Sequence, residues 1–216
     1  MTYLELVNDV LVRLRENEVT AVTDNAYSKL IGKYVNDAKR QVEDAYNWNA
    51  LSETLTVTTS ATLFNYILTG SGQRFRVLDV RNAETDMFLN YESTHNMNAL
   101  FNFSTLTEDG APRLYNFNGV DVNGDTQVDL FPIPDNVYNI YFNIIKPQDS
   151  LVNSADRLKI PSEPVLFLAY AKALIERGED GGLSSAESYQ LYQTSLADHI
   201  GSEANRYPDE LVWQAN

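Results

Sequence analysis

The spacing of apolar residues changes twice along this chain, and that change limits the folds that it can adopt. Residues 3–16 carry apolar side chains three or four positions apart, as on one face of a helix: Leu4, Val7, Leu11 and Leu14. From about residue 51 the apolar residues alternate instead, which is typical of half-buried strands. After residue 158 the helical spacing returns. The sequence therefore predicts helices at both ends and strands between them.

Three further helices follow from the same spacing. One is expected over 26–47, with Trp48 as an anchor just beyond its end. The segment 163–177 is apolar almost all round, so we expect it to be buried on more than one side. The last helix covers 185–204, and its apolar stripe consists of Tyr189, Tyr192, Leu196 and Ile200.

The alternating region holds six to eight strand candidates. Their ranges are 54–58, 63–68, 74–80, 87–92, 113–118, 126–131 and 137–145. Residues 93–106 fit either a short helix or a long loop. This number of strands is enough for a small sandwich or barrel.

Together these elements predict an α+β fold. The N- and C-terminal helix pairs, in residues 1–50 and 158–206, are expected to form a helical bundle. Residues 51–147 are expected to form an inserted antiparallel β-sandwich or barrel-like domain. Residues 207–216 are left as a C-terminal tail.

Composition excludes several classes of protein. With 44% hydrophobic residues among 216, the chain can bury a sizeable core, and without cysteine it has no disulfide and no thiolate zinc site. No run approaches the roughly 18 apolar residues of a membrane span. Glu5 and Asp9 interrupt any signal-peptide pattern at the start, so we expect synthesis in a cytoplasm and no membrane partner.

The net charge of −14 at pH 7 restricts the partners further. Binding to a phosphate backbone needs clustered Lys and Arg, whereas the basic residues here are scattered. A surface this acidic repels nucleic acid, which would suit a wall past which DNA slides without binding.

The stretch "GVDVNGDTQVDLF", which starts at residue 119, fits two structures. Its polar residues alternate as the first three ligands of a calcium loop do: Asp121, Asn123 and Asp125. The sixth and twelfth positions of that loop require Gly and an acidic residue, and here they are Thr126 and Pro132. The calcium interpretation therefore fails, and we predict no metal site.

The same stretch satisfies the requirements of a β-hairpin. Asn123-Gly124 is predicted to be a two-residue turn that places Phe117 opposite Leu130. One face of the pair then carries only apolar residues, namely Tyr115, Phe117, Val128 and Leu130.

The two histidines, His95 and His199, are the candidates for acid–base chemistry. Ser93 and Thr94 adjoin His95, but no oxyanion-type glycine motif accompanies them. The segment 70–74, "GSGQR", lacks the Lys and Ser/Thr of a phosphate loop and is expected to be a turn. We therefore predict no catalytic residue and no cofactor.

The C-terminal tail contains an apolar cluster beyond a proline. We take as its candidate partner-docking residues Tyr207, Leu211, Val212 and Trp213. Two outcomes stay open, because terminal segments dock either way: the cluster folds back onto its own domain, or it contacts a partner with Trp213 as the hot spot.

Several segments of the chain resemble the head-to-tail adaptor (connector) proteins of tailed bacteriophages, which include the tail tubular protein A of short-tailed phages. These segments are the opening "LELVNDVLVRLREN", the helix end "AYNWNALSETLTV", and the return "LKIPSEPVLFLAYAKALIERGED" with "AESYQLYQTSLADHI". The resemblance covers most of the chain as a layout of helices around inserted strands.

The resemblance implies a structural virion protein that is not an enzyme. Such a protein forms a ring homo-oligomer, a dodecamer, which joins the portal protein to the tail nozzle protein and extends the DNA channel. DNA passes through without specific binding. The C-terminal tail would dock onto the portal, and the inserted strands would lie toward the tail. Localisation would be in the virion, and in the host cytoplasm before assembly.

Two other functions stay open. One is a glycan-binding or glycan-cleaving β-module, which would show exposed aromatic residues converging with two carboxylates in a groove. The other is a different phage tail-completion component, which would share the same kind of partner.

Overall fold

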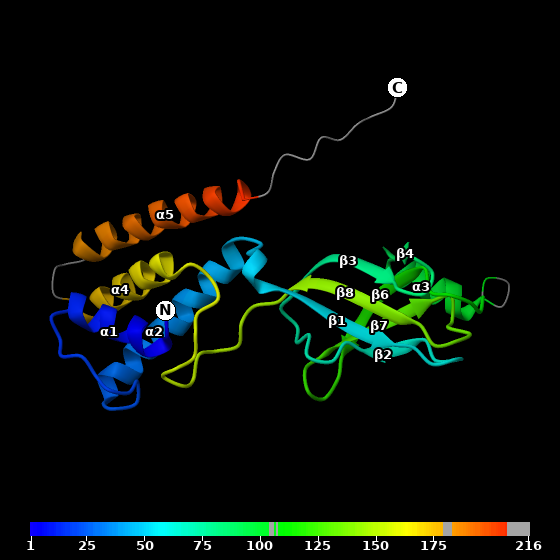
Figure 1. The fold of residues 1–216 in the computed structure, drawn as a ribbon, viewed down its shortest axis with the longest axis horizontal. Coiled ribbons are helices and arrows are strands. Elements are labelled where there is room, and N and C mark those ends of the chain that lie inside the picture. The colour runs from blue at the N-terminus through cyan, green and yellow to red at the C-terminus, as the bar shows by residue number, and fades with distance from the viewer. Residues whose placement is uncertain (104–105, 107, 179–182, 207–216) are drawn as a thin grey trace, which may run out of the picture. The chain divides into compact units, whose positions relative to one another are not determined.

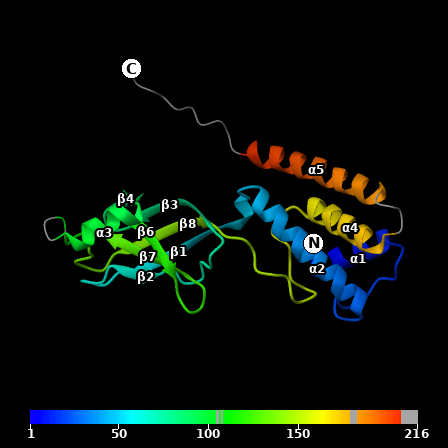
Figure 2. The same ribbon diagram turned by 180° about the vertical axis from the view of Figure 1, so that it is seen from behind.

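A computed structural model describes residues 1–103, 106, 108–178 and 183–206 of the chain. The chain divides into two compact units, drawn in Figure 1 and from behind in Figure 2. The helical unit comprises Met1–Leu51 and Gln148–Asn216, and the β-unit comprises Ser52–Pro147. The fold is therefore α+β, with the β-unit as one excursion of the chain between two parts of the helical unit.

The described part of the helical unit contains α1 (Tyr3–Arg13), α2 (Ala26–Ala45), α4 (Ser162–Arg177) and α5 (Leu183–Ala204). α4 packs against the other three helices. Its buried residues are Pro164, Val165, Leu166, Leu168, Ala169, Ala171 and Ala173. The expectation that this helix is buried on more than one side is confirmed, because a helix that is apolar all round gains most from several neighbours.

Local side chains set the starts of the first two helices. At α1, the Thr2 hydroxyl accepts from the Glu5 backbone N–H at 3.2 Å, and the Glu5 carboxylate accepts from the Thr2 N–H at 2.8 Å. At α2, the Asn25 side chain accepts from the Ser28 N–H at 2.7 Å. Each contact satisfies a backbone donor that has no partner within the helix.

The face that α5 buries differs from the predicted stripe. Tyr192 is buried as expected, but Tyr189 is 46% exposed, and Leu196 and Ile200 are only partly covered. Between Ser185 and Ser195 the buried side chains are instead mostly serines: Ser185, Ser188, Tyr192 and Ser195. Small side chains let two helices approach closely, so α5 packs on α4 through its serine side. Most of its apolar stripe lies to one side of this contact and is only partly covered.

The β-unit contains two four-stranded sheets. The first has the order β1 (Ser52–Thr58), β8 (Asn139–Ile145), β3 (Arg76–Asn82) and β4 (Met87–Phe88). The second has the order β2 (Asn65–Ile67), β7 (Thr126–Phe131), β6 (Leu114–Val120) and β5 (Asn90–Tyr91). The pairing of β5 with β6 is parallel, which departs from the expected antiparallel domain.

One core is shared by the two sheets. The first sheet contributes Val57, Val80, Ile140, Phe142 and Ile144, and the second contributes Tyr66, Tyr115, Val128 and Leu130. The rings of Tyr115 and Phe142 meet edge to face, with centroids 5.7 Å apart. Alternation places every second side chain of these strands on the core side.

The single strand predicted over 87–92 is wrong. Leu89 is buried and donates its N–H to the Val80 carbonyl at 2.8 Å, whereas the next residue, Asn90, donates to Arg113 at 3.0 Å. The chain therefore leaves the first sheet at Leu89 and enters the second. The following residues form α3 (Thr94–Asn102), which decides the choice between helix and loop for that region.

The predicted hairpin is present, but its register is wrong. Phe117 pairs with Val128 rather than with Leu130, a shift of two residues. A bulge after Phe117 contains Gly119 at φ +85°, and the loop spans 121–125 instead of a two-residue turn. Because side chains alternate with period two, this shift leaves the predicted apolar face unchanged.

The shared core predicts a large effect of one truncation. Phe142 is fully buried between the sheets. Replacing it with Ala removes the ring and leaves a cavity, so Phe142→Ala should lower the free energy of unfolding by about 3–5 kcal/mol. Thr56→Ala, on the exposed side of β1, should change it by less than about 0.5 kcal/mol. Urea denaturation followed by circular dichroism measures both, and equal midpoints would contradict the shared core.

Candidate functional site: the chain crossing and the exposed surfaces

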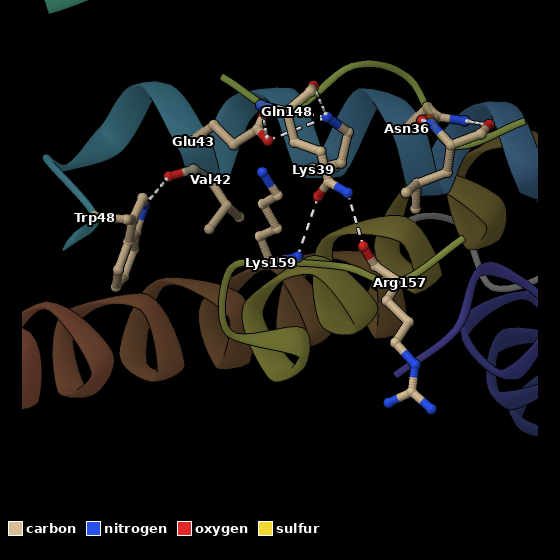
Figure 3. A network of polar contacts seen from close by, with 9 residues as sticks. Asn36, Lys39, Val42, Glu43, Trp48, Gln148, Arg157 and Lys159 are labelled. Atoms are coloured by element: carbon tan, nitrogen blue, oxygen red, sulfur yellow. Dashed lines mark hydrogen bonds and ion pairs between the residues drawn. The ribbon is translucent and has the colours of Figure 1, made fainter. Parts of the chain in front are cut away.

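Side chains of α2 hold the chain where it returns from the β-unit, as Figure 3 shows. Lys39 Nζ donates to the backbone carbonyl of Gln148, and Glu43 Oε1 accepts from the Gln148 N–H at 3.0 Å. Lys39 and Glu43 also form an ion pair at 3.1 Å, with side chains only 4% and 1% exposed. A buried ion pair needs further hydrogen bonds to offset its desolvation, and the Gln148 backbone supplies them.

Two neighbouring contacts extend this attachment. The Asn36 side chain donates to the Leu151 carbonyl at 3.0 Å and accepts from the Leu151 N–H at 2.8 Å. The Gln148 side chain donates to the Arg157 carbonyl at 2.7 Å and accepts from the Lys159 N–H at 3.1 Å. Polar side chains of α2, together with that of Gln148, thus bind backbone groups of the returning chain.

The outgoing chain is fixed just beyond the end of α2. Trp48 is 1% exposed, and its indole N–H donates to the Val42 carbonyl at 2.7 Å, as expected of an anchor. The Asn49 N–H donates at 3.1 Å to the buried carboxylate of Glu203 on α5, which also pairs with Arg206 at 2.7 Å. Both crossings of the chain are therefore attached to the helical unit by buried groups.

The two acidic residues of the hairpin loop bind backbone amides. Asp121 accepts from the N–H groups of Asn123 and Asp125 at 2.9 and 2.8 Å. Asp125 accepts from those of Gly70 and Gly72, both at 3.0 Å. Within the described ranges, no group of three or more Asp, Glu or His side chains is arranged to hold a metal ion. The carboxylates shape the loop.

The residues around the histidines have structural contacts. Ser93 Oγ caps α3 by accepting a backbone N–H at 3.3 Å, and Thr94 donates to a buried asparagine at 3.4 Å. His95 is exposed beside them. His199 Nε2 lies 3.3 Å from a Glu163 carboxylate oxygen, which links α5 to α4.

Several of the exposed apolar side chains of the β-unit lie close together in sequence in two segments that the sequence patterns did not single out. Around β4 and β5, the exposed residues are Met87 (49%), Phe88 (67%) and Tyr91 (60%). Around β2, they are Leu63 (47%), Phe64 (38%) and Ile67 (45%). Groups of exposed apolar side chains mark interaction surfaces, so both places are candidate contact sites.

A cavity of about 320 Å³ lies beside the first of these groups. Its lining residues are Arg81, Asn82, Ala83, Asp86, Met87 and Phe88. The lining contains a single carboxylate, that of Asp86. Glycoside cleavage needs two acidic groups that converge on the bond, and this cavity does not supply that pair.

Charge is distributed over both units. Residues 52–147 contain 11 acidic and 5 basic residues, and the remainder of the chain contains 19 and 11. Each unit is therefore acidic by itself. None of the helices in the described ranges is long and apolar enough to span a membrane. The predicted docking residues, Tyr207, Leu211, Val212 and Trp213, lie outside the described residues and stay a prediction.

Comparison with known proteins gives one result over almost the whole chain. A family model described as "SU10 adaptor protein" matches residues 1–212. No curated protein shows a significant match to the chain.

The contacts of Lys39 and Glu43 at Gln148 predict strong coupling between these two buried charges. Lys39→Met leaves the Glu43 carboxylate buried without its cation, so it should lower the free energy of unfolding by about 3–5 kcal/mol. The double variant Lys39→Met/Glu43→Leu should cost clearly less than the two single changes added together. Lys33→Met, at an exposed position of α2, is the control and should stay within about 0.5 kcal/mol. Strictly additive costs in urea denaturation would contradict the coupling.

The Asp125 contacts predict a pH dependence of stability. The Gly70 and Gly72 amides donate to the ionised carboxylate and so lower the pKa of Asp125 below its ordinary value. Stability from a lowered folded-state pKa is present above the unfolded-state pKa and is lost as the pH falls through the folded-state value. Asp125→Asn should therefore lower the melting temperature at pH 7, and this difference should shrink below about pH 4. A difference that persists undiminished at about pH 2 would rule out this origin.

Proposed function

Because the chain belongs to the SU10 adaptor protein family and is thus a structural component of the phage virion, we propose that it is the connector between head and tail. In this role, copies of the chain form a ring, a dodecamer, between the portal protein and the tail nozzle protein. The ring extends the DNA channel. It works through its surfaces and catalyses no reaction.

The family match carries this proposal, because it runs from residue 1 to residue 212 and so includes both units. The exposed apolar groups around β2 and around β4 and β5 support it, since a protein that works by contact needs surfaces of this kind. We assign them to the tail side, where the nozzle protein would cover them.

The acidic charge of both units supports a role beside moving DNA. A channel wall that bound phosphates would slow the passage of DNA, and binding requires clustered cations. With a net charge of −14, the ring would repel the duplex and keep it free to slide.

The portal contact is assigned to the C-terminal tail. Trp213 is the candidate hot spot, because tryptophan at the centre of an interface contributes more than most residues. Trp213→Ala should weaken binding to purified portal particles by about 30-fold or more, which corresponds to about 2 kcal/mol. Gln214→Ala, in the same segment, is the matched control and should bind like the unmodified protein. Biolayer interferometry measures both affinities.

Electron microscopy of the same mixtures tests the assembly itself. Rings seated on portal particles are the expected result. A chain that stays monomeric and does not bind portal would overturn the proposed function. Equal binding by the two variants, with rings still present, would overturn only the role of Trp213.

A further inference from the structure

One side of α5 forms a continuous surface without charge. We call it the α5 flank, and it consists of Tyr189, Gln193, Leu196, Ala197, Ile200 and Gly201. With 3.6 residues per turn, these positions fall within about 140° of one another around the helix. The flank runs beside the serine side that packs on α4.

The described chain leaves this flank largely uncovered. Tyr189 is 46% exposed, and Gln193, Ala197 and Gly201 are also exposed. A Cβ atom added at Gly201 would meet no other atom within 4 Å. Figures 1 and 2 both show α5 beside α4 at the outer edge of the helical unit.

The packing of α5 is incomplete as it stands. The hydroxyl of Ser195 is buried without a hydrogen-bond partner, although burying an unpaired polar group costs free energy. At the same time the larger apolar residues Leu196 and Ile200 stay only partly covered. A helix of 22 residues that buries serines and leaves its apolar stripe half exposed has room for a second neighbour on its flank.

Charge indicates what that neighbour is. The acidic residues of α5 lie off the flank: Glu187 and Asp198 lie about 40° and 60° beyond Gly201 around the helix, and Glu203 is buried against Asn49. Two copies of a chain with a net charge of −14 repel each other over most of their surfaces. They can approach most closely where charge is absent, and interface cores are depleted of charged residues and enriched in tyrosine.

We propose that the α5 flank packs against a second copy of the chain. The inference rests on the proposed function in one respect, since in a ring this contact is heterologous and joins the flank to a different surface of the next copy. Ala197 and Gly201 make the flank shallow toward its C-terminal end, so the neighbour's backbone comes close there, and Tyr189 covers the opposite end.

A charge placed on the flank tests the proposal. Ala197→Glu should weaken self-association by about 100-fold or more, because an unpaired charge buried in an interface costs several kcal/mol. Leu191→Glu is the matched control: Leu191 is 56% exposed on the same helix but lies outside the flank, so self-association should not change. Sedimentation velocity over a range of concentrations measures association, and circular dichroism checks that both variants fold.

Chemical protection gives a second readout that does not depend on disrupting the assembly. The chain has no cysteine, so a single introduced thiol reports on one position. In the assembled protein, Ala197→Cys should react with iodoacetamide at least about 10-fold more slowly than Leu191→Cys. Under dissociating dilution the two should react alike.

The outcomes separate this inference from the proposed function. Equal alkylation of both positions in an assembled ring would overturn the role of the flank and leave the connector proposal intact. Protection of Ala197→Cys in a dimer that forms no ring would support the flank and overturn the ring. An unmodified chain that stays monomeric at every concentration, with or without portal, would overturn both.

Discussion

A buried ion pair between Lys39 and Glu43 holds the backbone of Gln148 against α2, and the two-unit construction depends on this contact. The chain leaves the helical unit beside Trp48 and returns at Gln148 after an excursion of nearly a hundred residues. Closing so long a loop costs conformational entropy. Fixed attachment at both ends lets α1 and α2 pack with α4 although the β-unit separates them in sequence. The buried charges of Lys39 and Glu43 also favour one position of the returning segment, because shifting it along α2 would leave a buried charge or amide without its partner.

In the β-unit, buried contacts join two sheets rather than two distant segments of the chain. Its two sheets meet over one apolar core, and the chain passes from one sheet to the other at Leu89, whose side chain is part of that core. Beyond the core, the short β4 and β5 and the edge strand β2 carry exposed apolar side chains. A virion component of the adaptor family meets other virion proteins, and surfaces of this kind suit such contacts. The helical unit shows the same property on α5, where the uncharged flank is largely uncovered.

Local rules explain where prediction from sequence worked and where it did not. The burial of α4 on several sides follows from its all-round apolar sequence, a pattern within a few residues. The hairpin register did not follow, because Asp125 binds the amides of Gly70 and Gly72, some fifty residues away, and a bulge at Gly119 absorbs the difference. The division of the predicted strand 87–92 at Leu89 also depends on distant residues, because Leu89 pairs with Val80 and Asn90 pairs with Arg113. The candidate site was harder to predict, since exposed residues such as Phe88 carry no periodic signal and the predicted docking residues lie outside the described ranges.

The sequence by itself determined that helices at both ends enclose a region of strands, and it also determined the apolar face of the hairpin and the acidic character of the surface, because spacing, alternation and charge are properties of neighbouring residues. Membership of the adaptor family also rests on sequence. Only the tertiary structure decided which side of α5 is buried. Its stripe of Tyr189, Tyr192, Leu196 and Ile200 predicts one face, but packing on α4 selected the serine side, since the depth to which two helices approach depends on both surfaces together.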